Sequence, residues 1–463
     1  MRSRVVAPNV VLWVSSLSVA VGLALAAPAC SRGSAPGQKP STGPTGPTGQ
    51  TGATGPTTSL TYYKDVKAII DEKCVGCHVT GGIGPFDLTT YAGVHMEGAL
   101  IAPAVQAQIM PPWMPSSDTP PLVGNRSLSA EQISTVVSWI QGGMPEGNPA
   151  DAPVETPPAN TFTPTATLKV AQPYTPNPSL GTDDYHCFVL DPQLTADTAV
   201  TGFDIIPGDR RIVHHALVYA VAPADLSSLQ TAEAGGDGNG YTCFGSSGVA
   251  TAGLLAAWAP GASATLLTPG TGIVVKAGSM LVLQVHYNLL NAPNPMAPPS
   301  DQTTAQLQYG AVSSITQAEF YLVADTSFNI PVGAVQTVSY ALDTGSLGTA
   351  GKPFYVYGIL PHMHLHGTDI QVSVTHPDNS TELLMHVPKW QFQWQAAYLY
   401  ENYITLSYGD TVNLSCTFNN TAAAQPIIDG VQETPEPLTW GEDTLNEMCL
   451  SFLYVAGAPP KQP

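Results

Sequence analysis

The sequence predicts a chain of several domains, in which a small α-helical domain is followed by two β-sandwiches in tandem. At 463 residues the chain is too long for one hydrophobic core. Charged residues make up only 11%, and glycine and proline number 43 each, a composition that favours turn-rich β-domains over long helices. From about 166 to 455, short apolar segments alternate with Gly, Pro and Asn turns, and we expect no helix longer than two turns there.

The helical domain is expected over 60–149. Ser129 and Gln132 form a capping box that opens a helix, and apolar residues then recur at helical spacing up to a pair of glycines at 142–143. A shorter helix over 65–73 leads into Cys74. A linker rich in Pro and Thr is expected over 150–165.

The two β-sandwiches, of jelly-roll-like type, are expected over 166–305 and 306–458. Pro- and Asn-rich turns between 291 and 313 interrupt the strands and give the boundary. Four cysteines fall in this part of the chain, and their even number in an exported protein predicts two disulfides. Spacing leaves all three pairings open; the cysteines are Cys187, Cys243, Cys416 and Cys449.

Residues 1–30 have the pattern of an export signal. Arg2 and Arg4 precede an apolar run, and small residues lead to Cys30, where a bacterial lipoprotein would carry its lipid. The expected location is periplasmic, or on the outer membrane or cell surface; cleavage to a secreted form and an uncleaved anchor are the alternatives. Residues 31–59, rich in Gly, Pro and Thr, are expected to be a linker. The net charge of −19 argues against nucleic acid as a partner.

Within the helical domain, Cys74-Val75-Gly76-Cys77-His78 is the motif for covalent attachment of c-type haem. The two thiols would bond the porphyrin and His78 would supply one axial nitrogen. Half of a zinc site would need a second cysteine pair nearby, and a redox disulfide would not need the histidine. The sequence therefore predicts a haem domain.

The sixth haem ligand should come from a downstream Met or His. The segment around Met110 resembles the Met-Pro-Pro-Trp of small bacterial cytochrome c domains, which points to Met110. A thioether ligand raises the haem potential, as suits an electron carrier. Met114, Met96 and His95 stay as alternatives.

Histidines in apolar segments suggest metal sites in the β-part. On a strand, His362 and His364 would lie roughly 6.6 Å apart on one face, whereas His366 would lie roughly 13 Å from His362. His214 and His215 are adjacent, so both can bind one metal only if their strand twists or bulges. Taken singly, His286 and Met448, like the paired histidines, could also be ordinary core or surface residues.

Taken in order, these segments resemble the copper type II ascorbate-dependent monooxygenases, the family of peptidylglycine α-hydroxylating monooxygenase and dopamine β-monooxygenase. The resemblance runs from about 185 to 455. It implies an electron-storing copper on His214, His215 and His286, and an oxygen-binding copper on His362, His364 and Met448. It also implies the disulfides Cys187–Cys243 and Cys416–Cys449, with ascorbate or another reductant as electron donor.

The chain departs from the peptide-hydroxylating members of that family at three positions. Leu360 stands where they have a carboxylate-binding Arg, and Leu450 and Phe452 stand where they have Asn and Tyr. A pocket without those polar groups cannot hold a C-terminal glycine carboxylate in the same way. The expected substrate is a less polar small organic molecule.

The sequence thus predicts an exported copper monooxygenase that hydroxylates a C–H bond with O₂. The fused haem is expected to pass electrons from an upstream donor to the storage copper. One alternative is a non-catalytic haem and copper protein that transfers electrons or handles copper. Another is a carbohydrate- or cell-surface-binding module whose histidines are structural.

Overall fold

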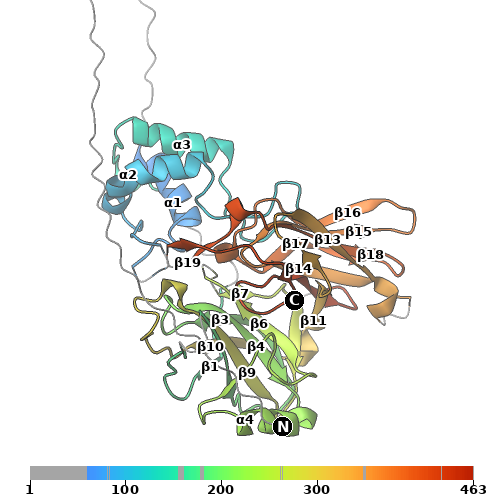
Figure 1. Ribbon diagram of the computed structural model, residues 1–463. Coiled ribbons are helices and arrows are strands. Elements are labelled where there is room, and N and C mark those ends of the chain that lie inside the picture. The colour runs from blue at the N-terminus through green and yellow to red at the C-terminus, as the bar shows by residue number, and fades with distance from the viewer. Residues whose placement is uncertain are drawn as a thin grey trace, which may run out of the picture. The chain divides into compact units, whose positions relative to one another are not determined.

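The fold was analysed in a computed structural model (Figure 1). The structure describes residues 60–461 apart from 81, 83, 155–160, 178–181, 261, 263, 348–350 and 429. The expected signal, Cys30 and the Gly-Pro-Thr linker lie outside these residues. Among the described residues, no helix has the length and apolar character needed to cross a membrane.

The N-terminal part is helical, with η1 (Tyr62–Val66), α1 (Lys67–Lys73), α2 (Tyr91–Gln106) and α3 (Ala130–Gln141). The capping box at the start of α3 is confirmed, because Ser129 Oγ accepts from the Gln132 backbone N–H and Gln132 Oε1 accepts from that of Ser129. The helices share a core that includes Tyr62, Ile70 and Trp139.

Helix α2 was not predicted. Its first turns contain Gly93 and Gly98, and Pro103 lies inside it, all residues that weaken a helical pattern. Gly98 is nevertheless suited to its place, because a Cβ there would lie 2.5 Å from the sulfur of Met144. Tertiary packing therefore outweighs the poor intrinsic propensity of this segment.

The first β-sandwich begins after the linker. Its elements are β1 (Ala166–Lys169), β2 (Asp183–Leu190), β3 (Thr198–Ile206), β4 (Val213–Val221), α4 (Leu226–Ala234), β5 (Tyr241–Thr242), β6 (Gly253–Trp258), β7 (Thr265–Leu266), β8 (Thr271–Val275), β9 (Met280–Asn288) and β10 (Thr304–Gly310). Strand β10, which spans the expected domain boundary, pairs with β1 and β3. The expectation of no helix longer than two turns was wrong, because α4 has nine residues. Its buried Leu229 packs beside the Cys187–Cys243 disulfide.

The second β-sandwich follows directly. Its elements are β11 (Thr316–Asp325), β12 (Asn329–Ile330), β13 (Val335–Asp343), β14 (Phe354–His362), β15 (Gly367–Thr375), β16 (Thr381–Val387), β17 (Tyr398–Leu406), β18 (Thr411–Asn419), β19 (Ile427–Ile428), β20 (Val431–Gln432), β21 (Leu438–Thr439) and β22 (Cys449–Ala456).

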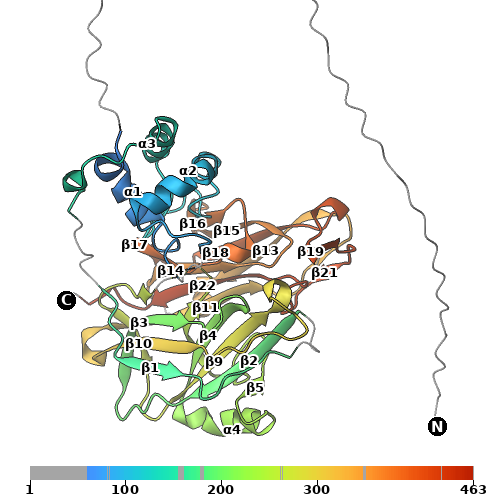
Figure 2. The same cartoon turned by 90° about the vertical axis from the view of Figure 1, so that its left-hand side faces the viewer.

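One long sheet belongs to both sandwiches. Its strand order is β1-β10-β3-β8-β11-β22-β14-β17, and β8 of the first sandwich pairs in parallel with β11 of the second. A five-stranded sheet, β5-β2-β9-β4-β6, completes the first sandwich, and a four-stranded sheet, β13-β18-β15-β16, completes the second. Figure 2 shows β11 and β22 between the strands of the two sandwiches. The all-β architecture of this part of the chain is as expected.

Both disulfides pair as the resemblance implied. Cys187 of β2 is bonded to Cys243, just after β5, and Cys416 of β18 is bonded to Cys449, the first residue of β22. All four cysteines are buried. Two disulfides agree with folding in an oxidising compartment.

The chain between α2 and α3 packs against the second sandwich. The Ser116 N–H donates to the His386 carbonyl at 2.8 Å, and Leu122 forms a β-bridge with Tyr400. Met114 is only 8% exposed and belongs to the hydrophobic core of this sandwich. The 113–126 segment is therefore structurally part of the second sandwich, although it lies in the predicted helical domain.

Candidate metal centres

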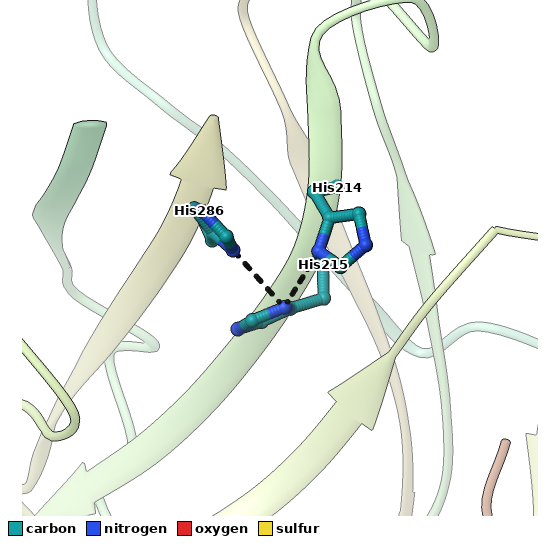
Figure 3. Close-up of side chains that lie close together, drawn as sticks. All are labelled: His214, His215 and His286. Carbon is teal, nitrogen blue, oxygen red and sulfur yellow. Dashed lines mark hydrogen bonds between the residues drawn. The ribbon is translucent and has the colours of Figure 1, made fainter. Parts of the chain in front are cut away.

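Three histidines converge between β4 and β9. His215 lies directly opposite His286 in the pairing of these strands, and the register shifts between Val213 and His215, so that β4 bulges at His214. This is the bulge that two adjacent histidines need in order to face one metal. Figure 3 shows the three imidazoles pointing toward one another. The candidate ligand atoms of His214, His215 and His286 all lie within 4.8 Å of one another.

The nitrogens that face one another are all Nδ1. His215 Nδ1 lies 3.2 Å from His214 Nδ1 and 3.3 Å from His286 Nδ1. His286 donates its Nε2 proton to Asp183 at 2.7 Å, which leaves the Nδ1 lone pair free. Burial, reinforced by the neighbouring histidines, holds the pKa of His214 and of His215 well below the usual value. With His214 and His215 neutral, three converging imidazole Nδ1 atoms suit a shared cation such as copper.

Two aromatic rings fix this cluster. Tyr185, on the strand next to β9, stacks on His286 at 4.0 Å with the rings 9° from parallel. Phe392 of η8 (Phe392–Trp394) stacks on His214 at 4.3 Å. The Nε2 of His214 has no hydrogen-bond partner in the described part of the chain, so stacking on Phe392 and the Nδ1 contact with His215 position this ring.

Asp183 connects the His214–His215–His286 cluster to the other sandwich. Its Oδ1 accepts from His286 and, at 2.6 Å, from the Thr444 hydroxyl in the loop before β22. Burial opposes its ionisation, but the hydrogen bonds from His286 and Thr444 outweigh burial and hold the pKa of Asp183 well below the usual value. Sequence reasoning missed Asp183, because nothing in a lone Asp indicates that it will lie behind a histidine 103 residues away.

The second candidate site lies at the end of β14. His362 is the last residue of β14, whereas His364 and His366 lie in the turn before β15. The strand spacing considered for the three histidines therefore does not apply beyond His362. Met363, which would sit on the opposite face of a strand, is fully buried in the core of the second sandwich where the chain turns. The turn still brings the rings of His362 and His364 to 5.0 Å.

The outward nitrogens of these two histidines are available to a metal. Gln395 Oε1 lies 2.6 Å from His362 Nδ1, and the Asn446 carbonyl lies 3.1 Å from His364 Nδ1. These acceptors place a proton on Nδ1 of each ring and leave Nε2 free to bind a metal. Burial lowers the pKa of His362 to about 4 and that of His364 well below its usual value, so both rings are neutral at pH 7.

Glu447 fixes the turn that carries His364 and His366. The carboxylate is fully buried, and Oε1 accepts from the His366 backbone N–H at 2.6 Å. Its Oε2 accepts from the backbone N–H groups of His364 at 2.9 Å and of Met448 at 3.3 Å. Burial raises the pKa of Glu447, and the hydrogen bonds from His366 and the backbone oppose that rise. A signal for this residue was present in the sequence, in the Glu-Met-Cys around Met448.

The His366 ring does not join those of His362 and His364. Its Nδ1 lies 3.3 Å from Glu447 Oε1, and its Nε2 lies 3.3 Å from Gln425 Oε1. The ring is 4% exposed. His366 is thus a buried partner of Glu447.

One cavity of about 700 Å³ joins the two candidate sites. His215, His362, His364 and Met448 line it, and the rings of His215 and His362 are 6.4 Å apart. Phe392, stacked on His214, also approaches His364 at 5.7 Å. The three positions that depart from the peptide-hydroxylating pattern, Leu360, Leu450 and Phe452, line the same cavity.

The haem motif lies at the end of α1. Cys74 and Cys77 are free thiols, and burial, followed by the proximity of Cys77, raises the pKa of Cys74 to about 11. His78 Nδ1 lies 3.2 Å from the Phe86 carbonyl, which leaves Nε2 for a haem iron. Gly84 allows the close approach, because a Cβ there would be 2.6 Å from His78 Nδ1. These residues fit a c-type haem.

Two of the alternative sixth ligands have surroundings that do not suit a haem ligand. Met114 lies in the core of the second sandwich, where its Sδ accepts from the Gln391 N–H at 3.3 Å. Met96 is 77% exposed on α2. Met110 lies between α2 and the 113–126 segment and is partly buried. It stays the predicted sixth ligand.

The chain was compared with known proteins. No curated protein sequence matches it. Among solved structures, the VP2 subviral particle of infectious bursal disease virus is 9% identical, with a TM-score of 0.17, over 67% of this chain and 75% of that chain. A putative secreted protein from Parabacteroides distasonis is 7% identical, with a TM-score of 0.15, over 64% of this chain and 88% of that chain. Neither likeness bears on the function.

A family model does match the second sandwich. The matched residues, 335–460, contain His362, His364, Met448, the Cys416–Cys449 disulfide and Glu447. This part of the chain is thus similar to the C-terminal domain of the copper type II ascorbate-dependent monooxygenases.

Proposed function

We propose that the chain is a copper-dependent monooxygenase that hydroxylates a C–H bond of a small organic substrate. The overall change would be R–H + O₂ + 2 e⁻ + 2 H⁺ → R–OH + H₂O. The observation that supports the proposal is that His215, from the His214–His215–His286 cluster, lines the same cavity as His362, His364 and Met448. Imidazole and thioether together form a ligand set that suits copper cycling between its two oxidation states.

The proposed division of labour follows the ligand types. His214, His215 and His286 would hold one copper, and His362, His364 and Met448 would hold the other. Bound copper would supply one-electron transfer at the first site and activation of O₂ at the second. Tyr185 and Asp183 fix the orientation of His286, and Gln395 fixes the tautomer of His362.

The cavity would bind the substrate beside His362, His364 and Met448. Leu360, Leu450 and Phe452 give this wall an apolar surface, so a substrate carboxylate would find no partner there. The apolar wall would also exclude water from the reacting C–H bond. The proposed substrate is therefore not a glycine-extended peptide.

Electrons would enter through the N-terminal domain. Cys74, Cys77 and His78 would hold a c-type haem, with Met110 as the other axial ligand. The haem would supply single electrons from an upstream donor, in place of or together with ascorbate. Covalent linkage keeps the donor at a high effective concentration near the copper sites. Export and a lipid anchor at Cys30 are part of the same proposal, and the two disulfides support export.

Metal analysis followed by an oxygen-uptake assay tests the proposal. Protein matured in a bacterial periplasm should contain two coppers and one haem per chain. With reductant and a panel of apolar substrates, it should consume O₂ in step with hydroxylated product. Met448→Ala should abolish that uptake, while Met296→Ala, at a methionine that is 77% exposed, should not change it.

Each outcome of that assay has a clear meaning. Two coppers and a haem without coupled O₂ uptake would favour an electron-transfer or copper-handling protein. Absence of copper would leave a binding module with structural histidines. Haem that is reduced but is not reoxidised faster when copper and O₂ are present would contradict the electron-feeding role.

A further inference from the structure

The cavity is lined in part by the 113–126 segment, which precedes the β-sandwiches in the chain. Trp113, Val123, Gly124 and Arg126 line the same cavity as His362. The family match, over 335–460, does not include these residues. A wall of the candidate active site is therefore supplied from outside the matched domain.

The 113–126 segment is held in place at both ends. Near its start, the Gln391 N–H donates to Met114 Sδ at 3.3 Å. Near its end, the Val123 N–H donates to the Leu399 carbonyl at 2.8 Å, and the Glu401 N–H donates to the Pro121 carbonyl at 2.9 Å. These backbone bonds add the segment to the edge of β17. A wall fixed in this way can discriminate between substrates, because it does not have to be ordered when a ligand binds.

Trp113 is the largest side chain of the 113–126 segment at the cavity. It contacts the edge of Tyr398, with ring centroids 5.4 Å apart, and Tyr398 lines the cavity as well. Tyr398 begins β17 and is only three residues from Gln395, which contacts His362. The indole thus contacts Tyr398, which pairs with Ile359 of β14, the strand that ends at the candidate ligand His362.

The lining offers little to a charged ligand. Apart from histidines, the ionisable side chains with a usual charge at pH 7 among the described lining residues are Arg126 and Glu442. Burial, followed by repulsion from Asp443, raises the pKa of Glu442 to about 7, so this carboxyl is only partly charged at neutral pH. The remaining wall is dominated by apolar and aromatic side chains, which do not repay the cost of desolvating an ion.

We propose that Trp113 is a substrate-contacting, specificity-determining residue, and that it selects a neutral substrate with a ring or compact alkyl group. This inference rests on the proposed function. The substrate's apolar group would lie between Trp113 and the apolar wall formed by Leu360 and Leu450. The C–H bond to be hydroxylated would then face His362, His364 and Met448. The 113–126 segment, which precedes the β-sandwiches in the chain, would thus contribute to substrate recognition.

Binding of three matched probes tests the inference without turnover. The probes are 3-phenylpropan-1-ol, 3-phenylpropanoate and 3-phenylpropylamine, which share one ring and differ in charge. Calorimetry on the copper-loaded, full-length protein under anaerobic conditions gives each Kd. The alcohol should bind at least about tenfold more tightly than either ion. Trp113→Ala should weaken binding of the alcohol about tenfold, and Trp113→Phe should keep it within about threefold of wild type.

The controls separate a contact from a structural effect. Tyr340→Ala removes a ring that is 38% exposed on β13 and should leave all three Kd values unchanged. Copper content and thermal stability show whether Trp113→Ala is folded. If it is not, the Kd values of Trp113→Phe and Trp113→Leu for the alcohol are compared instead. Weaker binding to Trp113→Leu with unchanged binding to Trp113→Phe supports the inference.

Several results would overturn it. One is that Trp113→Ala binds the alcohol as tightly as wild type does. Another is that wild type binds the propanoate most tightly and Arg126→Gln loses that binding. A third is that none of the three probes binds wild type. Failure of the proposed function looks different. In that case the alcohol binds in a Trp113-dependent way, but no O₂ is consumed with any substrate.

Discussion

The carboxylate of Glu447 accepts a hydrogen bond from the backbone N–H of His364 at 2.9 Å. Because Glu447 precedes Met448 in the chain, one buried side chain holds the segment of one proposed copper ligand in register with another. The same carboxylate also accepts hydrogen bonds from the backbone N–H groups of His366 and of Met448 itself. The turn that carries His364 and the backbone at Met448 are therefore fixed by one shared acceptor before any metal binds.

Replacing Glu447 should cost both stability and copper. Glu447→Ala leaves three buried N–H groups without their acceptor, and we expect the free energy of unfolding to fall by about 3 kcal/mol. Glu447→Gln keeps one acceptor oxygen, so its free energy of unfolding should fall by less. Urea denaturation and copper content measure the two effects. Glu401→Gln, at an exposed carboxylate on β17, is the control. Full copper occupancy in Glu447→Ala would contradict this role.

The two histidine clusters should hold one copper each. His286→Ala and His364→Ala should each lower the copper content from two to one per chain, because a single ligand is lost from a different site. The double variant should hold none. His386→Ala, at a histidine paired with Asp369 on the surface, should keep both. Elemental analysis of purified protein gives the count; loss of both coppers in either single variant would mean that the clusters form one site.

Asp183→Asn should weaken copper binding at the His286 site about 10- to 100-fold, because the partner that orients the imidazole is lost. Competition with a chelator measures the change. Asp184→Asn is a matched control: this neighbouring carboxylate is also buried but accepts from Tyr174 and the Asn177 N–H instead. Equal loss in both variants would show that the effect is one of general stability.

Removing the Cys416–Cys449 disulfide should destabilise the protein by about 3–4 kcal/mol, because the bond closes a loop of 33 residues. Since Cys449 directly follows Met448, we expect copper loss at the His362 site as well. The Cys187–Cys243 pair closes a loop of 56 residues in the other sandwich. Serine substitutions there should cost similar stability while leaving copper at the His362 site. Denaturation curves and copper content test both pairs.

Glu442 should make stability depend on pH. Its pKa is about 7 in the folded chain and near 4.5 ordinarily, so the folded state binds more protons between these values. Stability should therefore fall as pH rises from about 4.5 to 7. Glu442→Gln should remove this slope; because the group is partly exposed, we expect a change of only roughly 1–2 °C in Tm. Thermal melts at pH 5 and pH 8 give the comparison, and an unchanged slope would contradict the role.

Local chemistry was the most predictable part of the fold. The capping box of α3 depends on two residues three apart, so the sequence alone identifies it. The bulge at His214 was stated as the condition for metal binding by adjacent histidines, and the strand pairing contains it. The disulfide pairing needed the family resemblance, because the number of cysteines alone leaves three possibilities.

Long-range features were not predictable. The helical pattern of α2 is weakened by Gly93, Gly98 and Pro103, and its formation depends on packing against α3. The turn after His362 follows from the burial of Met363, whose environment comes from distant strands. Asp183 and Glu447 act across 103 and more than 80 residues, respectively, and local spacing carries no information about such contacts.

The attachment of the 113–126 segment to β17 has a consequence for how this protein could have arisen. If the helical domain folded independently of the rest, the chain could be cut or recombined at the Pro- and Thr-rich linker near 150–165. A truncation there would strip Leu122 and its neighbours from Tyr400 and leave the edge of β17 unpaired, which invites aggregation. A recombination that exchanged one half would therefore have to preserve the contacts of this segment with the other half.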